Sequence, residues 1–355
     1  MKIGFIIGSL NYSGAEKIAR YLIDVLHNQY HYEIGVILLS GEGPYSDIDY
    51  IKQFVIKTKG NKFLRVYNRQ KQIRNIVNLE KYEIVISFGV KFNIDAMEAL
   101  KNTNTKVILC ERNDPVNDPH RKILRIRRRI IYPFATGYIF QTRRIGNFFG
   151  KKIFEKGTVI PNFIERPMKN LYSEKNENNI VITARLDDVQ KNISLLLRAF
   201  YKFSQSNDYH LYIVGNGPDE KKLKFYAQKM KLEDRVHFMG KKNVYDYLKI
   251  AKIFVLSSNY EGMPNSLIEA MASGIPSIAT DCNGGGAAEL IQDHVNGTLV
   301  PINDEDAMVN ALNELANSSK LRKQYSEKAY ELNKKLEMNY IIKLWVSYIE
   351  KIAKL

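Results

Sequence analysis

Residues 251–280, AKIFVLSSNYEGMPNSLIEAMASGIPSIAT, decide the fold, because they read as a strand, a loop, a helix and a second strand. Gly262 and Pro264 prevent a helix from running through Glu261, and proline is favoured in the first turn of a helix. We therefore expect the helix to begin near Pro264, with Glu269 more than one turn into it. A strand, a helix and a further strand in succession are typical of a parallel βαβ unit.

The same alternation of apolar runs and helical stretches continues along the rest of the chain. Further strands are predicted at 2–7, 32–39, 82–89, 105–111 and 136–142, and later at NIVITARL, YHLYIVGNG, RVHFMG and GTLVP. Strands of this kind, separated by helices, form parallel sheets that are covered on both faces. We therefore expect an α/β fold made of two Rossmann-like, doubly wound domains that face a central cleft.

The domain boundary is predicted at the polar stretch ERPMKNLYSEKNENN, residues 165–179, which lacks apolar periodicity. We expect an N-terminal domain over 1–165, a linker over 166–179 and a C-terminal domain over 180–337. The helical stretch 338–355 carries one apolar stripe, and we expect it to pack back on the first domain.

Length and composition narrow the class of protein. A chain of 355 residues, 45% of them apolar, fits two domains and excludes a disordered protein. Cys110 and Cys282 are far apart, which argues for a reducing compartment and against a disulfide framework or a cysteine metal site. We see no secretion signal and no run of about 20 apolar residues, and so expect a cytoplasmic protein without a transmembrane helix.

The positive charge is concentrated in one half of the chain. Residues 1–170 hold 29 Lys and Arg against 15 Asp and Glu, whereas residues 171–355 hold 24 against 23. The basic half is expected to attract a polyanion, either nucleic acid or an anionic membrane face.

The first candidate site is the loop that carries Glu261 and continues into the helix of Glu269. Backbone N–H groups at 262–266 lie at a helix N-terminus and suit anions and hydroxyls. Two carboxylates around such a loop can each accept hydrogen bonds from a pair of sugar hydroxyls. Taken alone, a solvated Glu261 and a partly buried Glu269 would explain the pattern equally well.

The second candidate is TARLDDVQKN, residues 183–192, directly after a predicted strand. Arg185 and Lys191 flank a turn that enters a helix, and from there both can reach a diphosphate. Together they would neutralise a leaving diphosphate without a metal ion. Standing alone, the two residues would be interpreted as surface cations.

Three glycine-containing loops add weaker signals. SLNYSGAEK (9–17) lacks the G-x-G-x-x-G spacing, which argues against a nicotinamide or flavin enzyme, although Gly14 lets a ligand approach the backbone. DCNGGGAAELI (281–291) offers bare backbone amides or simply a flexible loop. VGNGPDEKKL (214–223) is interpreted as packing or as a contact to the edge of a nucleotide.

Taken in order, the loops SGAEK, ARLDDVQKN, IVGNGPDE, EGMPNSLIEAMASGIP and GGGAAELI resemble the retaining glycosyltransferase family 4, which has the GT-B architecture. The ordered set spans residues 13–291 and is far more specific than any one loop. The resemblance implies a nucleotide sugar, with UDP as the nucleotide, bound mainly to the C-terminal domain. It also implies a hexosyltransferase that needs no metal ion.

The resemblance further implies residue roles. Glu261 would lie near the hydroxyls of the donor sugar and Glu269 on the ribose, while Arg185 and Lys191 would hold the diphosphate. Donor contacts are also implied for Gly14, Ala15, Gly215, Gly262, Met263, Pro264, Asn265, Ser266, Leu267 and Gly285. Ala184 replaces a glycine that is common in relatives, which we consider a small change.

Arg112 is a larger departure from the family. Relatives place a histidine near the reactive carbon of the donor sugar, whereas CERNDP (110–115) offers Arg112 there. Arginine is no base at neutral pH, but it can bind a hydroxyl or a phosphate. That fits a front-face mechanism in which the leaving phosphate oxygen takes the acceptor's proton. We count Arg112 among the catalytic residues, with its role open.

The segment DPHRKILRIRRRIIYP, residues 118–133, interleaves cations with aliphatic side chains, as basic amphipathic helices on anionic membranes do. The predicted surface for membrane or acceptor consists of Arg121, Lys122, Arg125, Arg127, Arg128 and Arg129. Relatives extend lipid-diphosphate-linked glycans at the cytoplasmic face, and we expect a peripheral protein with such an acceptor, in bacterial surface polysaccharide synthesis. A solvated helix face is the simpler alternative.

Two other classes of function remain open. A nucleic-acid-binding protein would be expected to place aromatic side chains between its cations, whereas here the cations alternate with aliphatic ones. A sugar-nucleotide epimerase of the same fold would need no acceptor, and the loop with two glutamates argues against it. A phosphorylase would be far longer and would carry pyridoxal phosphate. Fold alone does not decide between these enzymes.

Overall fold

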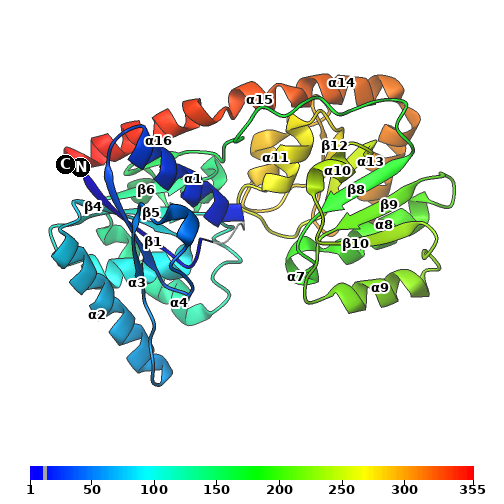
Figure 1. The fold of residues 1–355 in the computed structure, drawn as a ribbon. Coiled ribbons are helices and arrows are strands. Elements are labelled where there is room, and N and C mark those ends of the chain that lie inside the picture. The colour runs from blue at the N-terminus through cyan, green and yellow to red at the C-terminus, as the bar shows by residue number, and fades with distance from the viewer. Residues whose placement is uncertain (11–13) are drawn as a thin grey trace. The chain divides into compact units, whose positions relative to one another are not determined.

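The computed structural model describes residues 1–10 and 14–355. These residues form two units: unit 1 comprises Met1–Phe163 and Asn339–Leu355, and unit 2 comprises Ile164–Met338 (Figure 1). Each unit is an open parallel sheet covered by helices on its two faces.

Within its described residues, unit 1 has a sheet of seven parallel strands in the order β3-β2-β1-β4-β5-β6-β7. The strands are β1 (Lys2–Ile7), β2 (Glu33–Leu38), β3 (Lys52–Val55), β4 (Ile84–Phe88), β5 (Lys106–Glu111), β6 (Gly137–Phe140) and β7 (Gly157–Val159). Every residue of β4 is buried, because side chains on both faces of this central strand are covered by helices.

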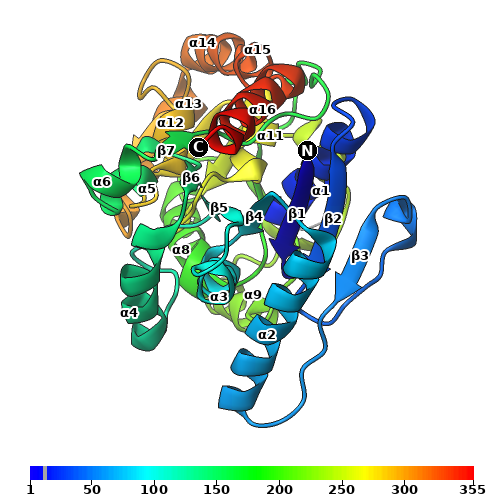
Figure 2. The same ribbon diagram turned by 90° about the vertical axis from the view of Figure 1, so that its left-hand side faces the viewer.

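The helices of unit 1 lie in two layers. Figure 2 shows α2 (Lys62–Glu80), α3 (Val90–Leu100) and α4 (Lys122–Ile131) on one face of the sheet, and α1 (Gly14–Asn28) and α16 (Met338–Ala353) on the other. The chain also forms α5 (Arg143–Phe148), α6 (Lys151–Phe154) and the short 3₁₀ helices η1 (Ser46–Ile48) and η2 (Tyr132–Phe134). Apolar side chains of α2, α3 and α4 pack with those of the strands in one buried cluster.

Helix α16 belongs to unit 1 although unit 2 precedes it in the chain. The buried Trp345 ring stacks on Phe88 of β4, with 5.8 Å between ring centroids. The hydroxyl of Tyr348 accepts a hydrogen bond from the backbone N of Tyr138 at 2.8 Å and donates one to the carbonyl of Lys156. These contacts fasten the helix to β4 and to the starts of β6 and β7.

Residues 164–338, all of which the structure describes, form a sheet of six parallel strands in the order β10-β9-β8-β11-β12-β13. The strands are β8 (Asn179–Thr183), β9 (His210–Val214), β10 (Val236–Gly240), β11 (Ile253–Leu256), β12 (Ser277–Thr280) and β13 (Thr298–Val300). Successive residues of β8 alternate between two cores, with Ile180 and Ile182 in one and Val181 in the other.

The helices of unit 2 follow its strands in the βαβ order. They are α7 (Asp188–Lys191), α8 (Ile193–Phe203), α9 (Glu220–Lys229), α10 (Val244–Leu248), α11 (Asn265–Ala272), α12 (Gly286–Leu290), α13 (Glu305–Asn317), α14 (Ser319–Tyr330) and α15 (Leu332–Lys335). Side chains of α8, α9 and α13 build one core, and those of α10, α11 and α12 build the other.

The segment 166–179, interpreted from its composition as a linker, lies against unit 2. The backbone N of Met168 donates to Asn333 Oδ1 at 2.7 Å, and that of Leu171 donates to the carbonyl of Ser273 at 2.9 Å. Glu174 forms an ion pair with Arg322. Met168, Leu171 and Tyr172 also pack against a core of unit 2, so hydrogen bonds, charge and apolar contacts together hold this stretch.

The predicted α/β fold with two parallel sheets is confirmed, and the helix after the loop of Glu261 begins at Asn265, as expected. The sequence does not predict β3 and β7, which have four and three residues and lie at the two edges of their sheet. These two strands are half-buried and short, so they lack the continuous apolar run of the inner strands. Among the described residues, no helix combines the length and apolarity needed to cross a membrane.

Candidate active site

The strand order of the unit 2 sheet reverses between β8 and β11, which are neighbours in the sheet but not in the sequence. In open parallel sheets, ligands bind at the carboxyl ends of the strands where the order reverses. The loops that leave β8 and β11 carry ARLDDVQK and SSNYEGMP, so topology brings the second and first candidate motifs together.

Lys191 and Glu261 are in direct contact across this point. Lys191 lies in the last turn of α7, and its Nζ forms an ion pair with Glu261 Oε1. Ser258 Oγ donates to the same carboxylate oxygen at 2.7 Å, and only 7% of Glu261 is exposed. The sequence predicts separate roles for the two residues, whereas the structure joins them into one largely buried pair of opposite charges.

Amide side chains fix the two loops around this ion pair. Asn192, with a φ of 46°, donates from Nδ2 to Asn259 Oδ1 at 2.9 Å and to Asn303 Oδ1 at 2.8 Å. Asn259 N donates to the carbonyl of Gln190, and Ser257 Oγ donates to that of Lys191, both at 2.8 Å. Sequence analysis missed these supporting residues, because their partners lie 66 to 111 residues away along the chain.

Helix α11 begins directly after the Glu261 loop, with Pro264 at its N-cap. Asn265 and Ser266 are half-buried, whereas Leu267 is fully buried in the core, so only its backbone can face a ligand. The backbone N–H groups of this first turn are suited to a phosphate or hydroxyl. Glu269 follows in the second turn and is half-buried.

Arg185 is held much less firmly than Lys191. Its side chain is 68% exposed, and its guanidinium lies 3.6 Å from Asp187 Oδ2. An exposed ion pair at this distance contributes little to stability, so the arginine keeps the freedom to turn toward an anion.

Two glycines are required by close backbone contacts at this site. A Cβ on Gly215, whose φ is 138°, would lie 1.9 Å from the carbonyl oxygen of Ala184. A Cβ on Gly286 would lie 1.8 Å from the carbonyl oxygen of Gly262. The predicted donor contact Gly285 has a φ of 71°, and the neighbouring Gly286 is the residue that packs against the Glu261 loop.

The N-terminal candidate loop is only partly described. Gly14 and Ala15 are the first residues of α1, while residues 11–13 of SLNYSGAEK lie outside the described residues. Ser9 Oγ donates to Glu16, which joins the end of β1 to the first turn of α1.

Arg112 in unit 1 lies at the carboxyl end of β5. Its Nη2 donates to Asn162 Oδ1 at 2.5 Å, and its guanidinium carbon is 5.7 Å from the centre of the Phe88 ring. Its Nε and Nη1 atoms are buried and have no hydrogen-bond partner among the residues that the structure describes. Burial lowers the pKa of Arg112 to about 10, so the side chain remains charged at neutral pH, with two nitrogen donors to offer.

The preceding residue, Glu111, is a buried carboxyl group. It accepts hydrogen bonds from Tyr132 Oη and from Asn93 Nδ2, the latter at 3.0 Å. Burial raises the pKa of Glu111 to about 7, against smaller lowering effects of Arg128 and the two hydrogen bonds. The Glu111 carboxyl group therefore gains and loses its proton near neutral pH.

The predicted basic surface needs a correction at Arg128. This side chain is 4% exposed, donates to the carbonyls of Pro115 and Asp118 at 2.8 Å, and lies over the ring of Phe148 at 5.2 Å. Leu124, Arg128 and Ile131 are spaced by four and three residues, so they share the inward face of α4. Arg127 is also engaged, in an ion pair with Glu98.

The outward face of α4 is apolar as well as basic. Ile123, Ile126 and Ile130 are 56%, 56% and 64% exposed, again at spacings of three and four. The predicted cations that remain exposed around them are Arg121, Lys122, Arg125 and Arg129. On α2, Phe63 and Tyr67 are also exposed. Side chains of α2, α3 and α4 line a hollow of about 530 Å³ between these three helices.

No group of three or more His, Cys, Asp or Glu side chains with the geometry of a metal site occurs among the residues that the structure describes.

Residues 164–332 match the family model described as "Glycosyl transferases group 1". The chain is 27% identical to a Campylobacter jejuni enzyme over 99% of both chains. That enzyme is the GalNAc-alpha-(1->4)-GalNAc-alpha-(1->3)-diNAcBac-PP-undecaprenol alpha-1,4-N-acetyl-D-galactosaminyltransferase. The present chain is also 25% identical to the amylovoran biosynthesis glycosyltransferase AmsD of Erwinia amylovora, over 95% of this chain and 96% of AmsD.

Solved structures share the fold at lower identity. The lipopolysaccharide outer core galactosyltransferase WaaB superposes over 100% of both chains with a TM-score of 0.82 and 21% identity. Anabaena Alr3699/HepE in complex with UDP superposes over 99% of this chain and 100% of that one, with a TM-score of 0.81 and 19% identity. These likenesses confirm the predicted GT-B fold.

Proposed function

Since this chain belongs to the glycosyltransferase group 1 family, also called glycosyltransferase family 4, we propose that it moves a hexose or N-acetylhexosamine from a UDP sugar to a glycan acceptor, with retention of configuration. The contact between Lys191 and Glu261 beside the first turn of α11 carries this proposal. In a nucleotide sugar, the diphosphate is next to the hydroxyls of the sugar. Lys191 could bind the diphosphate and the adjacent Glu261 the hydroxyls, so the order of the two side chains matches that of the ligand groups.

In the proposed reaction, the acceptor hydroxyl oxygen forms a bond to the anomeric carbon while the bond from that carbon to the diphosphate breaks. The acceptor's proton passes to the leaving phosphate oxygen, and UDP departs. Lys191, Arg185 and the N–H groups at the start of α11 stabilise the negative charge that develops on the diphosphate. Glu261 accepts hydrogen bonds from the sugar hydroxyls and holds the sugar in place.

Glu269, half-buried in the second turn of α11, is proposed to accept hydrogen bonds from the ribose hydroxyls. Gly215 and Gly286 support the same pocket indirectly, because their backbones lie against Ala184 and Gly262. Arg112 is proposed to bind a hydroxyl or phosphate oxygen through the N–H groups on Nε and Nη1. Because its pKa stays near 10, it acts as a donor and not as a base.

We propose a lipid-diphosphate-linked glycan as the acceptor, at an anionic membrane surface. Support comes from the Campylobacter jejuni relative, whose acceptor is linked to diphospho-undecaprenol, and from the outward face of α4. Exposed isoleucines can enter the boundary between headgroups and acyl chains while Arg121, Lys122, Arg125 and Arg129 contact anionic headgroups. A nucleic-acid surface would leave these isoleucines in water, so α4 favours the membrane.

The donor is tested by thermal unfolding of the purified protein with UDP, GDP, ADP and NAD, each with Mg²⁺ and with EDTA. A ligand that binds only the folded protein raises the melting temperature by mass action. We expect UDP alone to raise it, equally with and without the metal ion. A shift that requires Mg²⁺ would contradict metal independence, and a shift with NAD alone would contradict the glycosyltransferase proposal.

Transfer itself is tested with UDP-GalNAc, UDP-GlcNAc, UDP-glucose and UDP-galactose and a short-chain diphospho-polyprenol glycan. Formation of an elongated glycan with one donor, together with release of UDP, would support the proposal. Release of a changed nucleotide sugar without any acceptor would instead support an epimerase.

A further inference from the structure

The hollow between α2, α3 and α4 has no part in the reaction as proposed above. Helix α3 packs against both α2 and α4, and Figure 2 shows all three helices on the same face of the unit 1 sheet. The hollow has a volume of about 530 Å³, within the range of about 300 to 1,000 Å³ that is usual for small-molecule sites. It is therefore large enough to hold a ligand.

Charged side chains on the floor of this hollow hold the two outer helices to α3. Arg69 of α2 forms an ion pair with Asp95 of α3 at 2.6 Å, and Asp95 is 2% exposed. Arg127 of α4 donates from Nε to Glu98 Oε1 of α3 at 2.8 Å, and Gln70 of α2 donates to the same carboxylate group. These contacts fix the spacing of α2 and α4, and each acid on the floor is paired with an arginine.

The rim of the hollow is apolar. Phe63 and Tyr67 of α2 and Ile123 of α4 line the hollow, yet they are 86%, 63% and 56% exposed. Val66 and Leu124, which also line it, are half-buried. Large apolar side chains that gather in one exposed place are typical of a surface that a ligand or partner covers.

Two further cations in the lining are not neutralised by the acids of the floor. Lys91 of α3 and Arg121 before α4 are exposed, and neither forms an ion pair among the residues that the structure describes. The lining therefore carries two more positive than negative charges. It suits a ligand that joins an apolar part to a group with two or more negative charges, such as a diphosphate.

The hollow lies toward the edge of the sheet at which ligands bind. In a parallel sheet this is the edge formed by the carboxyl ends of the strands, and the helix after each strand begins there. The lining residues of α2 and α4 fall within 63–70 and 121–127, the first halves of the helices that follow β3 and β5. Arg112, which follows β5, lies at the same edge.

We propose that this hollow binds the isoprenoid chain of the acceptor, whose diphosphate contacts Lys91 and Arg121. The inference rests on the proposed function, which gives the acceptor a polyprenyl diphosphate. A single hollow with two available cations matches one chain that carries a diphosphate better than it matches a phospholipid, which has two acyl chains and a phosphodiester. The apolar rim buries the first isoprene units, whereas the bilayer surface proposed for α4 includes Ile126 and Ile130, which do not line the hollow.

Binding is tested by calorimetry with soluble probes below the concentrations at which they form micelles. The probes are farnesyl diphosphate, inorganic diphosphate and dihexanoyl phosphatidylglycerol, each with excess UDP present to occupy the proposed nucleotide site. We expect farnesyl diphosphate to bind at least about tenfold more tightly than the other two, because only it has both the isoprenoid chain and the diphosphate.

The chain offers matched controls for both parts of the site. Leu64 is in the same turn of α2 as Tyr67 and is 52% exposed, but it does not line the hollow. Tyr67→Ser should weaken the binding of farnesyl diphosphate about tenfold and Leu64→Ser less than about twofold. Lys91→Gln should weaken it about fivefold at low salt, and Lys101→Gln, at the other end of α3, less than about twofold. Equal losses within either pair would overturn the inference.

Photolabelling of the wild type keeps the test independent of how the variants fold. A diazirine analogue of farnesyl diphosphate, mapped by mass spectrometry, should label α2 within residues 63–70. Labels that spare α2 would overturn the inference. Phosphatidylglycerol that binds as tightly as farnesyl diphosphate would also overturn it and assign the hollow to a membrane phospholipid.

The inference and the proposed function fail in different ways. A protein that is labelled on α2 but transfers no sugar to any diphospho-polyprenol acceptor would overturn the proposed function and keep the hollow as a lipid site. Normal transfer to such an acceptor without a label on α2 would overturn this inference alone.

Discussion

Unit 1 and unit 2 have the same kind of sheet, but they prepare their ligand loops in opposite ways. In unit 2, Lys191 and Glu261 form an ion pair. In unit 1, the Nε and Nη1 atoms of the half-buried Arg112 have no hydrogen-bond partner among the described residues. Under the proposed function, a ligand in unit 2 would replace an existing contact, whereas a ligand in unit 1 would satisfy these two nitrogen donors. The comparison predicts different responses to substitution in the two units.

The largest effect is expected for Lys191→Ala in unit 2. Removing this cation should lower kcat by about 10² to 10³-fold, the scale for losing one group that stabilises transition-state charge. It should also weaken UDP binding, because Glu261 remains buried without its partner. The measurement is steady-state transfer together with calorimetric UDP affinity.

Lys222→Ala is the matched control for that variant. Lys222 lies 3.4 Å from Asp188 of α7, but its side chain is 68% exposed. We expect turnover within twofold of the wild type. Similar losses in Lys191→Ala and Lys222→Ala would mean that general positive charge, and not the pair with Glu261, is what matters.

Glu111→Gln should remove a pH dependence of stability that belongs to unit 1. Because burial raises the pKa of Glu111 from 4.5 to about 7, the folded protein binds its proton more tightly than the unfolded chain. The wild type should therefore lose stability as the pH rises from 4.5 to 7, with a slope approaching about 1.4 kcal/mol per pH unit. The variant should lack this loss and be the more stable protein above pH 7.

The measurement is urea unfolding of both proteins between pH 4 and pH 8. Asp95 and Asp118 also have raised pKa values, but they are present in both proteins and cancel in the difference. A difference in unfolding free energy that does not change with pH would show that Glu111 keeps its charge in the folded state.

Arg112→Lys tests the unbonded donors of unit 1. Lysine keeps the positive charge but cannot reproduce the planar arrangement of Nε and Nη1. We expect kcat to fall by about tenfold or more, with UDP affinity unchanged. If the variant loses UDP affinity and keeps its kcat, Arg112 belongs to the nucleotide site instead.

The smallest effect is expected at the membrane surface. Ile126→Ser combined with Ile130→Ser should weaken binding to anionic liposomes about tenfold, because less apolar area enters the bilayer. Leu79→Ser is the control, since Leu79 is 77% exposed near the other end of α2. Flotation of all three proteins with vesicles of the same composition measures the effect. If both variants lost the same amount of liposome binding, the α4 face would be an ordinary solvated surface.

The parts of the fold that could be predicted from sequence are those encoded locally. A buried inner strand such as β4 has a continuous apolar run, and Pro264 fixes the start of α11 within a few residues. The same holds for the Glu261 loop and for Lys191, which lie in compact motifs. The half-buried edge strands β3 and β7 carry no comparable local signal.

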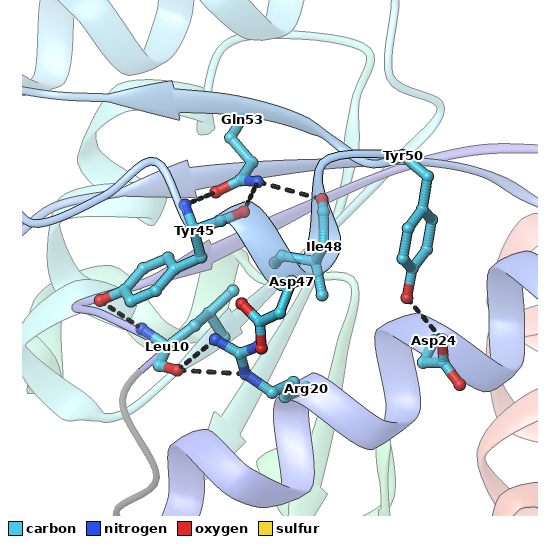
Figure 3. A network of polar contacts seen from close by, with 8 residues as sticks. All are labelled: Leu10, Arg20, Asp24, Tyr45, Asp47, Ile48, Tyr50 and Gln53. Carbon is cyan, nitrogen blue, oxygen red and sulfur yellow. Dashed lines mark hydrogen bonds and ion pairs between the residues drawn. The ribbon is translucent and has the colours of Figure 1, made fainter.

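What could not be predicted depends on contacts between distant residues. Lys191 and Glu261 are 70 residues apart, so their ion pair follows only from the strand order. The basic amphipathic pattern of residues 118–133 places Arg128 on the surface, but the buried side chain donates to two carbonyl groups and lies over an aromatic ring. No sequence motif marks the hydrogen bonds that Arg20 donates to the carbonyl of Leu10 (Figure 3).

The placement of α16 has a consequence for how the protein is made. Domains tend to fold as units while the chain emerges during synthesis. Unit 2 is complete once residue 338 has emerged, but unit 1 still lacks the helix that supplies Trp345 and Tyr348. The face of the unit 1 sheet around Phe88 therefore stays uncovered while all of unit 2 is translated. During that interval a chaperone, or the ribosome surface, would have to shield it.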